Sequence, residues 1–345
     1  MKKNANRMPS TGRCHLAPAL AGILHLAFSL SCSAAPAACA TEPNIQRFAF
    51  TDLEAPVFYN AESSLYDGSQ CELAVVHVHG WGSGVGIAKE EVPLTKALKA
   101  ALGPDAKPPY IISPLFPRRA ILKHMKEPAD GRAIWNDSWR GSLADAVAPN
   151  DDWRGGGDAV GTHLSSYDVI DRIFATLSDK NLFPNLKRVV MTGYSAGGQF
   201  VGRYAAVGKG IVREGITLEY AAMAPSTELR LDPNVSWHYG LKNRPRYSAA
   251  LTFDQILGNL SRRRVWRGCG DADTKGPGQT ALDVSPSAIT QGKNRYERFL
   301  NFKEYLKQFP AWEKQVSFYT FKGMSHNNAA AHSSPALISF IVGQP

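Results

Sequence analysis

Short apolar runs and stretches with helical spacing alternate along most of the chain. Residues 72–79 read ELAVVHVH, a run with the length and composition of a buried strand. Further strand-like runs are residues 47–50, 57–59, 110–115, 186–191, 216–223, 264–269 and 316–321. Helical stripes occupy residues 90–102, 166–177, 200–204, 253–260, 294–308 and 336–342. Because helical stretches separate most successive strands, we expect a mainly parallel sheet with helices on both faces.

Two stretches have no clear period. Residues 117–164 are rich in Trp, Asp and Gly and predict a long loop region over the sheet. Residues 227–250 also lack a period, and with the helix that follows they predict a cap or lid insertion at about 227–262. Aromatic residues in these stretches either line a substrate pocket or pack the loops onto the core. With no repeat or linker, residues 41–345 are interpreted as a single domain with this insertion.

The first forty residues have the pattern of a secretory signal peptide. A basic start with four cations precedes the apolar run 16–30, and small residues lead to Ala38-Cys39-Ala40. The run is short for a membrane span and contains Pro18 and His25. We therefore expect cleavage after Ala40, a periplasmic or secreted protein, and no stable membrane anchor afterwards.

Removal of this leader changes two further interpretations. The formal charge falls from +9 to +5 when the four leader cations are removed, and no basic run is interleaved with aromatic residues, so we expect no nucleic-acid partner. Cys71 and Cys269 are the cysteines left in the mature chain. They are expected near opposite edges of the sheet, which argues against a disulfide but does not exclude one. No cysteine or histidine spacing is typical of a metal site, so we expect no metal.

The strongest chemical signal is GYSAG at residues 193–197. It lies between an apolar strand-like run and a helical stripe, as in the nucleophile elbow of α/β-hydrolases. Ser195 would stand at the apex of a sharp turn, and the N–H of Ala196 would point into the same space from the start of the helix. The alternative is an ordinary Gly- and Ser-rich loop between a strand and a helix.

A serine nucleophile needs a histidine base and an acid that orients the histidine. His326 directly follows the last strand, and we favour it over His332, which lies six residues further on. Asp271 and Asp273 both follow the strand that ends near Cys269, and the end of that strand decides which carboxylate faces the histidine. The chain order of serine, acid and histidine is that of α/β-hydrolases.

The expected oxyanion hole requires two backbone N–H groups. Ala196 would supply one, and Trp81, in the HGWG stretch after the strand 72–79, would supply the other, with Gly82 as the alternative. We interpret His79 as structural, and His77 with His79 as insufficient for a metal site.

These residues together resemble the α/β-hydrolase superfamily over nearly the whole mature length. The chain is similar, more narrowly, to a group of secreted bacterial and fungal hydrolases without a settled substrate. The shared motifs are SSYDVID at 165–171, FPNL at 183–186, YSAGGQF at 194–200, RYA at 203–205, GDADT at 270–274 and QGKNRYER at 291–298. The resemblance implies the α/β-hydrolase fold and places the acid on Asp273. The chain departs from the group at Tyr194, where relatives often have histidine, and at Ala224, where Asn is expected.

The expected activity is cleavage of a carboxylic ester through an acyl-enzyme, with Ser195, Asp273 and His326 as the catalytic triad. The partner would be a small-molecule ester or acyl substrate, and no cofactor is expected. An amidase, a thioesterase or an acyltransferase would use the same triad. A binding protein that keeps the fold without activity is the alternative from another class.

Overall fold

The structure is a computed structural model that describes residues 45–82, 87–126, 131–136, 152–276 and 281–344. All of these residues belong to the compact unit Glu42–Pro345. The expected leader and its cleavage position lie outside the described residues. In the described part of the chain, no helix combines the length and the apolar character needed to cross a membrane.

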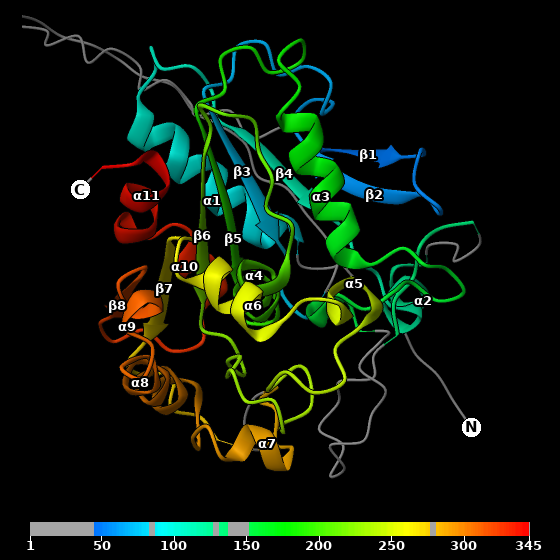
Figure 1. Ribbon diagram of the computed structural model, residues 1–345. Coiled ribbons are helices and arrows are strands. Elements are labelled where there is room, and N and C mark those ends of the chain that lie inside the picture. Colours follow the sequence, from blue (N-terminus) through cyan, green and yellow to red (C-terminus); the bar gives the residue numbers. More distant parts are fainter. Residues whose placement is uncertain (1–44, 83–86, 127–130, 137–151, 277–280, 345) are drawn as a thin grey trace, which may run out of the picture. The chain divides into compact units, whose positions relative to one another are not determined.

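The described residues form one eight-stranded sheet at the centre of this unit (Figure 1). Its strands are β1 Gln46–Phe50, β2 Val57–Ala61, β3 Leu73–Val78, β4 Tyr110–Pro114, β5 Arg188–Tyr194, β6 Thr217–Met223, β7 Val265–Gly270 and β8 Val316–Phe321. They lie in the order β1-β2-β4-β3-β5-β6-β7-β8. β2 is antiparallel to both of its neighbours, and all other pairs are parallel. The sheet is therefore mainly parallel, as the alternation of strand and helix predicts.

Helices connect the parallel strands and extend beyond the last one. They are α1 Ile87–Leu102, α2 Arg119–Met125, α3 Ser166–Leu177, α4 Ala196–Val207, α5 Arg246–Ala249, α6 Phe253–Leu260, α7 Pro286–Ile289, α8 Arg295–Leu306, α9 Pro310–Glu313, α10 Asn328–His332 and α11 Pro335–Val342, with a 3₁₀ turn, η1, at Trp153–Gly155.

Both faces of the sheet are covered by helices. Because adjacent residues of a strand point to opposite faces, neighbouring residues of one strand pack into different core clusters. Val75 of β3 belongs to a core cluster with Leu94 of α1 and Leu337 of α11. The next residue, Val76, belongs to another cluster, which contains Phe200 of α4. In Figure 1, α1 and α11 accordingly lie on one side of the strands, and α3 and α4 lie on the other. The carboxyl ends of the parallel strands then meet at one edge, where ligands gather in such sheets.

The stretch predicted as a long loop contains regular structure that its sequence does not announce. α2 begins without a capping side chain and without an acidic residue in its first turn, so the usual signals of a helix start are missing. α3, in contrast, starts with a capping box between Ser165 and Asp168, and its first residue, Ser166, is the first residue of the predicted helical stripe.

Two tryptophans of this stretch pack into the core. Trp135 and Trp153 are fully buried. The ring of Phe116 lies 5.2 Å from that of Trp135 and 5.6 Å from that of Trp153, measured between centroids. These two side chains therefore pack the loop onto the core and do not line a pocket. Trp139 lies outside the described residues.

The expected insertion is held by a buried arginine of the helix that follows Ser195. The Nε of Arg203 donates to the carbonyl of His238 at 2.7 Å, and its Nη1 donates to the carbonyl of Thr227 at 3.2 Å. Such bonds to carbonyls satisfy a guanidinium that burial would otherwise penalise. The insertion is thus tied to α4, close in sequence to the elbow.

Cys71 and Cys269 are both free and buried. Cys71 precedes β3 and Cys269 lies in β7, and β5 and β6 separate these two strands. Burial raises the pKa of Cys71 to about 11 and also raises that of Cys269, so both stay thiols at neutral pH.

Candidate active site

Ser195 lies at the junction of β5 and α4 in a strained backbone conformation. Its φ is 57° and its ψ is −112°, a region that residues with a side chain rarely adopt. The N–H of Ser195 donates to the carbonyl of Met223 at 2.9 Å, which fixes the turn against the end of β6. The turn is a nucleophile elbow in its geometry as well as in its sequence.

Three glycines make this elbow possible. A Cβ at Gly197 would lie 2.1 Å from the carbonyl oxygen of Val78, and a Cβ at Gly198 would lie 2.3 Å from that of Met223. A Cβ at Gly193 would lie 2.5 Å from the carbonyl carbon of Gly197. Because backbone atoms cannot yield as a flexible side chain can, these positions accept only glycine. The start of α4 thereby lies directly against the ends of β3 and β6.

His326 and Asp273 are brought together beyond the ends of β8 and β7. The Nδ1 of His326 lies 2.6 Å from the Oδ2 of Asp273. The aspartate side chain is 1% exposed and the histidine side chain 24% exposed. A buried carboxylate in this position fixes the tautomer of the imidazole and stabilises the imidazolium.

Asp271 has a different role in the structure. Its Oδ1 accepts a hydrogen bond from the N–H of Gly323 at 2.7 Å, and its Oδ2 lies 3.5 Å from Lys322 Nζ. Both partners belong to the turn after β8, which precedes His326. Asp271 therefore holds this turn, while Asp273 contacts the imidazole.

Two buried residues surround this pair. Arg295 at the start of α8 has its Nη1 4.0 Å from the Oδ1 of Asp273, and both side chains are 1% exposed. The hydroxyl of Tyr194 lies 3.3 Å from His326 Nδ1, and their rings are 4.8 Å apart. Burial lowers the pKa of His326 below its ordinary value of 6.5, the hydrogen bond to Asp273 opposes this shift, and the charge of Arg295 reinforces it.

The sequence did not reveal the contact of Tyr194 with the histidine. The elbow motif leaves the position before the serine open, so the motif alone predicts no role for Tyr194. Among the described residues, the hydrogen bonds of His326 go to Asp273 and Tyr194, and none joins it to the hydroxyl of Ser195. In proteins without bound substrate this contact is often long and shortens when substrate binds.

The two candidate oxyanion donors lie on segments that touch. Ala196 is the first residue of α4, where backbone N–H groups have no partner within the helix. Trp81 follows β3, whose last residue contacts Gly197. The guanidinium carbons of Arg118 and Arg154 lie 3.9 Å and 4.3 Å from the ring centroid of Trp81. Arg118 also donates from Nη2 to the Trp81 carbonyl at 3.1 Å, so this arginine contacts both the ring and the backbone of Trp81.

His332, the alternative to His326 as the histidine base, has different contacts. His332 belongs to α10, is fully buried, and has its Nδ1 2.5 Å from the side-chain oxygen of Asn328. Burial lowers its pKa to about 3. Its ring packs edge-on against His77 at 4.8 Å. In the described part of the chain, no group of three or more His, Cys, Asp or Glu side chains could hold a metal ion.

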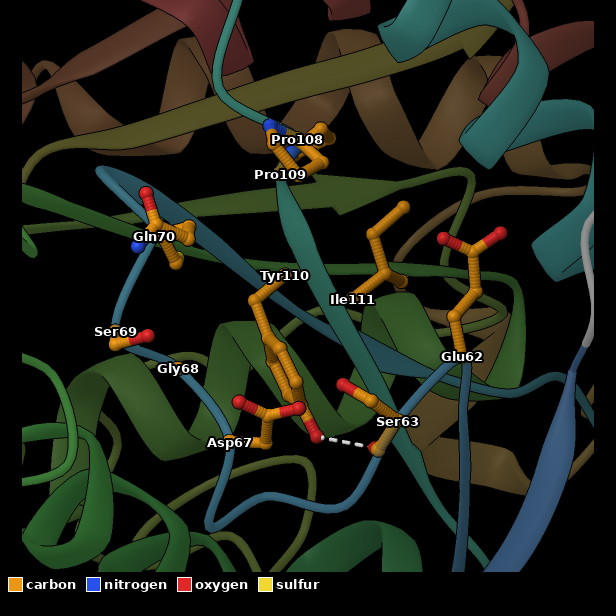
Figure 2. Close-up of a pocket in the computed structure, with 11 residues that line it drawn as sticks. Glu62, Ser63, Asp67, Gly68, Ser69, Gln70, Pro108, Pro109, Tyr110 and Ile111 are labelled. Carbon is orange, nitrogen blue, oxygen red and sulfur yellow. Dashed lines mark hydrogen bonds between the residues drawn. The ribbon is translucent and has the colours of Figure 1, made fainter.

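A pocket of about 220 Å³ lies at the other end of the strands from Ser195, Asp273 and His326. Figure 2 shows Tyr110 and Gln70 among its lining residues, with the Tyr110 hydroxyl donating to the carbonyl of Ser63 at 2.8 Å. Tyr110 begins β4 and Cys71 precedes β3. The pocket therefore lies at the amino edge of these strands, whereas Ser195 follows the carboxyl end of β5.

The order of the strands, the elbow after β5, and the positions of Asp273 and His326 after β7 and β8 are those of an α/β-hydrolase fold. Solved structures agree. Poly(aspartic acid) hydrolase-1 from Sphingomonas sp. KT-1 superposes with a TM-score of 0.61 at 17% identity, over 88% of this chain and 100% of that one. The poly(3-hydroxybutyrate) depolymerase LpqC from Bordetella parapertussis gives 0.59 at 18% identity, over 87% and 89%.

An S-formylglutathione hydrolase from Agrobacterium tumefaciens is also similar, with a TM-score of 0.51 at 11% identity, over 88% of this chain and 97% of that one. No protein-family model and no curated protein sequence matches the chain. The chain thus has the α/β-hydrolase fold, as the sequence motifs imply.

Exchange of the two aspartates should separate their roles. Asp273→Asn should lower the turnover of an ester by about three to four orders of magnitude, because the imidazole loses the carboxylate that sets its tautomer. Asp271→Asn is the matched control and should stay within about tenfold of the wild type, since it only weakens the turn after β8. Steady-state kinetics on a p-nitrophenyl ester measures both, and a larger loss in Asp271→Asn would contradict the assignment.

The pH profile should reflect the environment of His326. If His326 is the base of a hydrolase, it must act in its neutral form, and its pKa is lowered from 6.5, so activity should persist as the pH falls through 6.5 and disappear only at lower pH. The acid limb of kcat/KM measures this pKa in the free enzyme. A midpoint above pH 6.5 would contradict the prediction.

Proposed function

We propose that this protein is a serine hydrolase that cleaves a carboxylic ester through an acyl-enzyme intermediate. The observation that carries the proposal is the 2.6 Å contact between His326 and the buried Asp273, on an edge of the sheet that also holds the strained Ser195. Strain of this kind persists only where the surrounding structure enforces it, and it concentrates at active sites.

In this mechanism Ser195 Oγ attacks the substrate carbonyl while Nε2 of His326 accepts the hydroxyl proton. Asp273 stabilises the resulting imidazolium. The N–H groups of Trp81 and Ala196 hold the oxyanion of the tetrahedral intermediate. His326 then returns the proton to the leaving alcohol, and a water molecule, activated by the same histidine, releases the acyl group from Ser195. The reaction requires no cofactor.

The nature of the structural neighbours supports hydrolysis as the reaction. The three neighbours described above are named as two hydrolases and a depolymerase. Their names refer to different substrates, so they favour the reaction type more than any one substrate. A small ester or acyl compound is the substrate class that we propose for this chain.

We also propose that the protein acts in the periplasm or outside the cell, after removal of residues 1–40. The basic start, the apolar run 16–30 and the small residues at 38–40 support this proposal.

Reaction with a fluorophosphonate tests the activity and the processing together. The protein purified from the periplasm or culture medium of an expressing bacterium should gain one phosphonyl group on Ser195, because only an activated serine attacks phosphorus rapidly. Mass spectrometry of the intact chain and of its peptides measures the adduct and the first residue, which should be Thr41.

Ser195→Ala is the control for this experiment and should neither react nor hydrolyse a short p-nitrophenyl ester. The absence of an adduct, or an adduct on another residue, would contradict the proposed mechanism. Unchanged ester hydrolysis in Ser195→Ala would favour a binding protein with this fold. Parallel assays with an amide and a thioester compare the other acyl substrates open to the same triad.

A further inference from the structure

Both backbone polar groups of Gly80 are held by side chains. The N–H of Gly80 donates to Glu90 Oε2 at 2.9 Å, and the Nδ1 of His79 lies 2.7 Å from the Gly80 carbonyl oxygen. The Nε2 of His79 accepts the N–H of Phe116 at 3.1 Å, so the proton of a neutral ring is on Nδ1 and is donated to Gly80. Burial lowers the pKa of His79 to about 4, which keeps the ring neutral.

The bond from His79 acts on the peptide that carries the candidate oxyanion donor, and the bond to Glu90 acts on the peptide before it. The carbonyl of Gly80 and the N–H of Trp81 belong to one planar trans peptide, so they point in opposite directions. Glycine has more backbone freedom than any other residue. The direction of the Trp81 N–H therefore depends on outside contacts that fix Gly80, and Glu90 and His79 provide them on either side of its Cα.

Glu90 is well placed to restrain Gly80. It lies in the first turn of α1, its side chain is 12% exposed, and a Cβ at Gly80 would lie only 2.9 Å from its Oε1. Burial raises the pKa of Glu90, but the interactions with His77 and with the nearby His332 outweigh burial and lower it below the ordinary value. The group that accepts the Gly80 N–H is thus a carboxylate, and hydrogen bonds to a carboxylate are stronger than those to a neutral oxygen.

Buried histidines line the other side of Glu90. The Nε2 of His77 lies 3.4 Å from Glu90 Oε2, and its Nδ1 lies 3.0 Å from the hydroxyl of Ser113 on β4. The ring of His77 packs edge-on against His332, whose ring lies 6.3 Å from that of Tyr194. The contacts extend from the loop after β3 to the residue that precedes Ser195.

We propose that Glu90 is a positioning residue of the oxyanion hole. Its carboxylate restrains Gly80 so that the N–H of Trp81 points at the developing oxyanion. This inference rests on the proposed function, because it assigns Glu90 a part in the same acyl transfer. Glu90 itself touches neither substrate nor Ser195, and it acts through the backbone of Gly80.

Three variants test the role. Glu90→Met keeps the length of the side chain without an acceptor, and Glu90→Gln keeps a neutral acceptor. Glu62→Gln is the matched control, because Glu62 pairs with Lys99 in the last turn of the same helix. On a p-nitrophenyl ester we expect kcat to fall up to about 100-fold in Glu90→Met and about 3- to 10-fold in Glu90→Gln, with KM little changed.

A second measurement separates positioning from a general loss of structure. Sulfur is a weak hydrogen-bond acceptor, so a thionoester gains less than an ester from an oxyanion hole. The ratio of kcat/KM for an ester to that for its thiono analogue should therefore fall in both Glu90 variants and stay unchanged in Glu62→Gln. Urea unfolding of each variant confirms that the protein assayed is folded.

The outcomes are distinct. If the wild type hydrolyses the ester but both Glu90 variants match Glu62→Gln in kcat and in the ester-to-thionoester ratio, the role of Glu90 is overturned and the proposed function stands. If Glu90→Met does not fold, Glu90→Gln decides by the same two readings. If the wild type neither hydrolyses the ester nor reacts at Ser195, the proposed function fails and the role of Glu90 fails with it.

Discussion

The contact between Gly197 and the carbonyl of Val78 is the constraint on which the candidate site depends. A single added carbon at Gly197 would lie 2.1 Å from that oxygen. Because the first turn of α4 lies so close to the end of β3, the loop after β3 begins next to the residue that follows Ser195 by two positions. In this arrangement Ser195 has a positive φ, and such a strained backbone conformation costs of the order of 1–3 kcal/mol of stability.

Around this contact the chain buries several ionisable groups, each with a defined partner. Arg295 lies behind Asp273, and Glu90 lies behind Gly80. In a medium of low dielectric constant such charges act strongly and reorganise little, which favours preorganised stabilisation of charge in a transition state. The neutral His326 therefore donates a hydrogen bond to the carboxylate of Asp273, and the guanidinium of Arg295 behind that carboxylate disfavours a second proton on the ring.

The sequence alone predicts much of this architecture, because the relevant signals are local. The apolar run of β3 and the GYSAG turn depend on residues close in the chain, and both the central strands and the elbow are found where these patterns predict them. The choice between Asp271 and Asp273 depended on the resemblance, since both follow the same strand. In the structure the two carboxylates contact different residues, which spacing along the chain does not reveal.

The roles of Tyr194 and Glu90 could not be read from the sequence. An acidic residue in the first turn of a helix is ordinary, because it complements the helix dipole. Its contact with Gly80 depends on how α1 packs against the end of β3, which is a tertiary relation. α2 was missed for a different reason, since its first turn lacks the capping and acidic residues that mark most helix starts.

A crystal structure of the protein after reaction with a phosphonate inhibitor tests the central claim most directly. The account predicts phosphorus bonded to Ser195 Oγ and one phosphonyl oxygen at about 2.7–3.1 Å from the backbone nitrogens of both Trp81 and Ala196. Phosphorus on another residue, or a phosphonyl oxygen that points away from these two nitrogens, would contradict it.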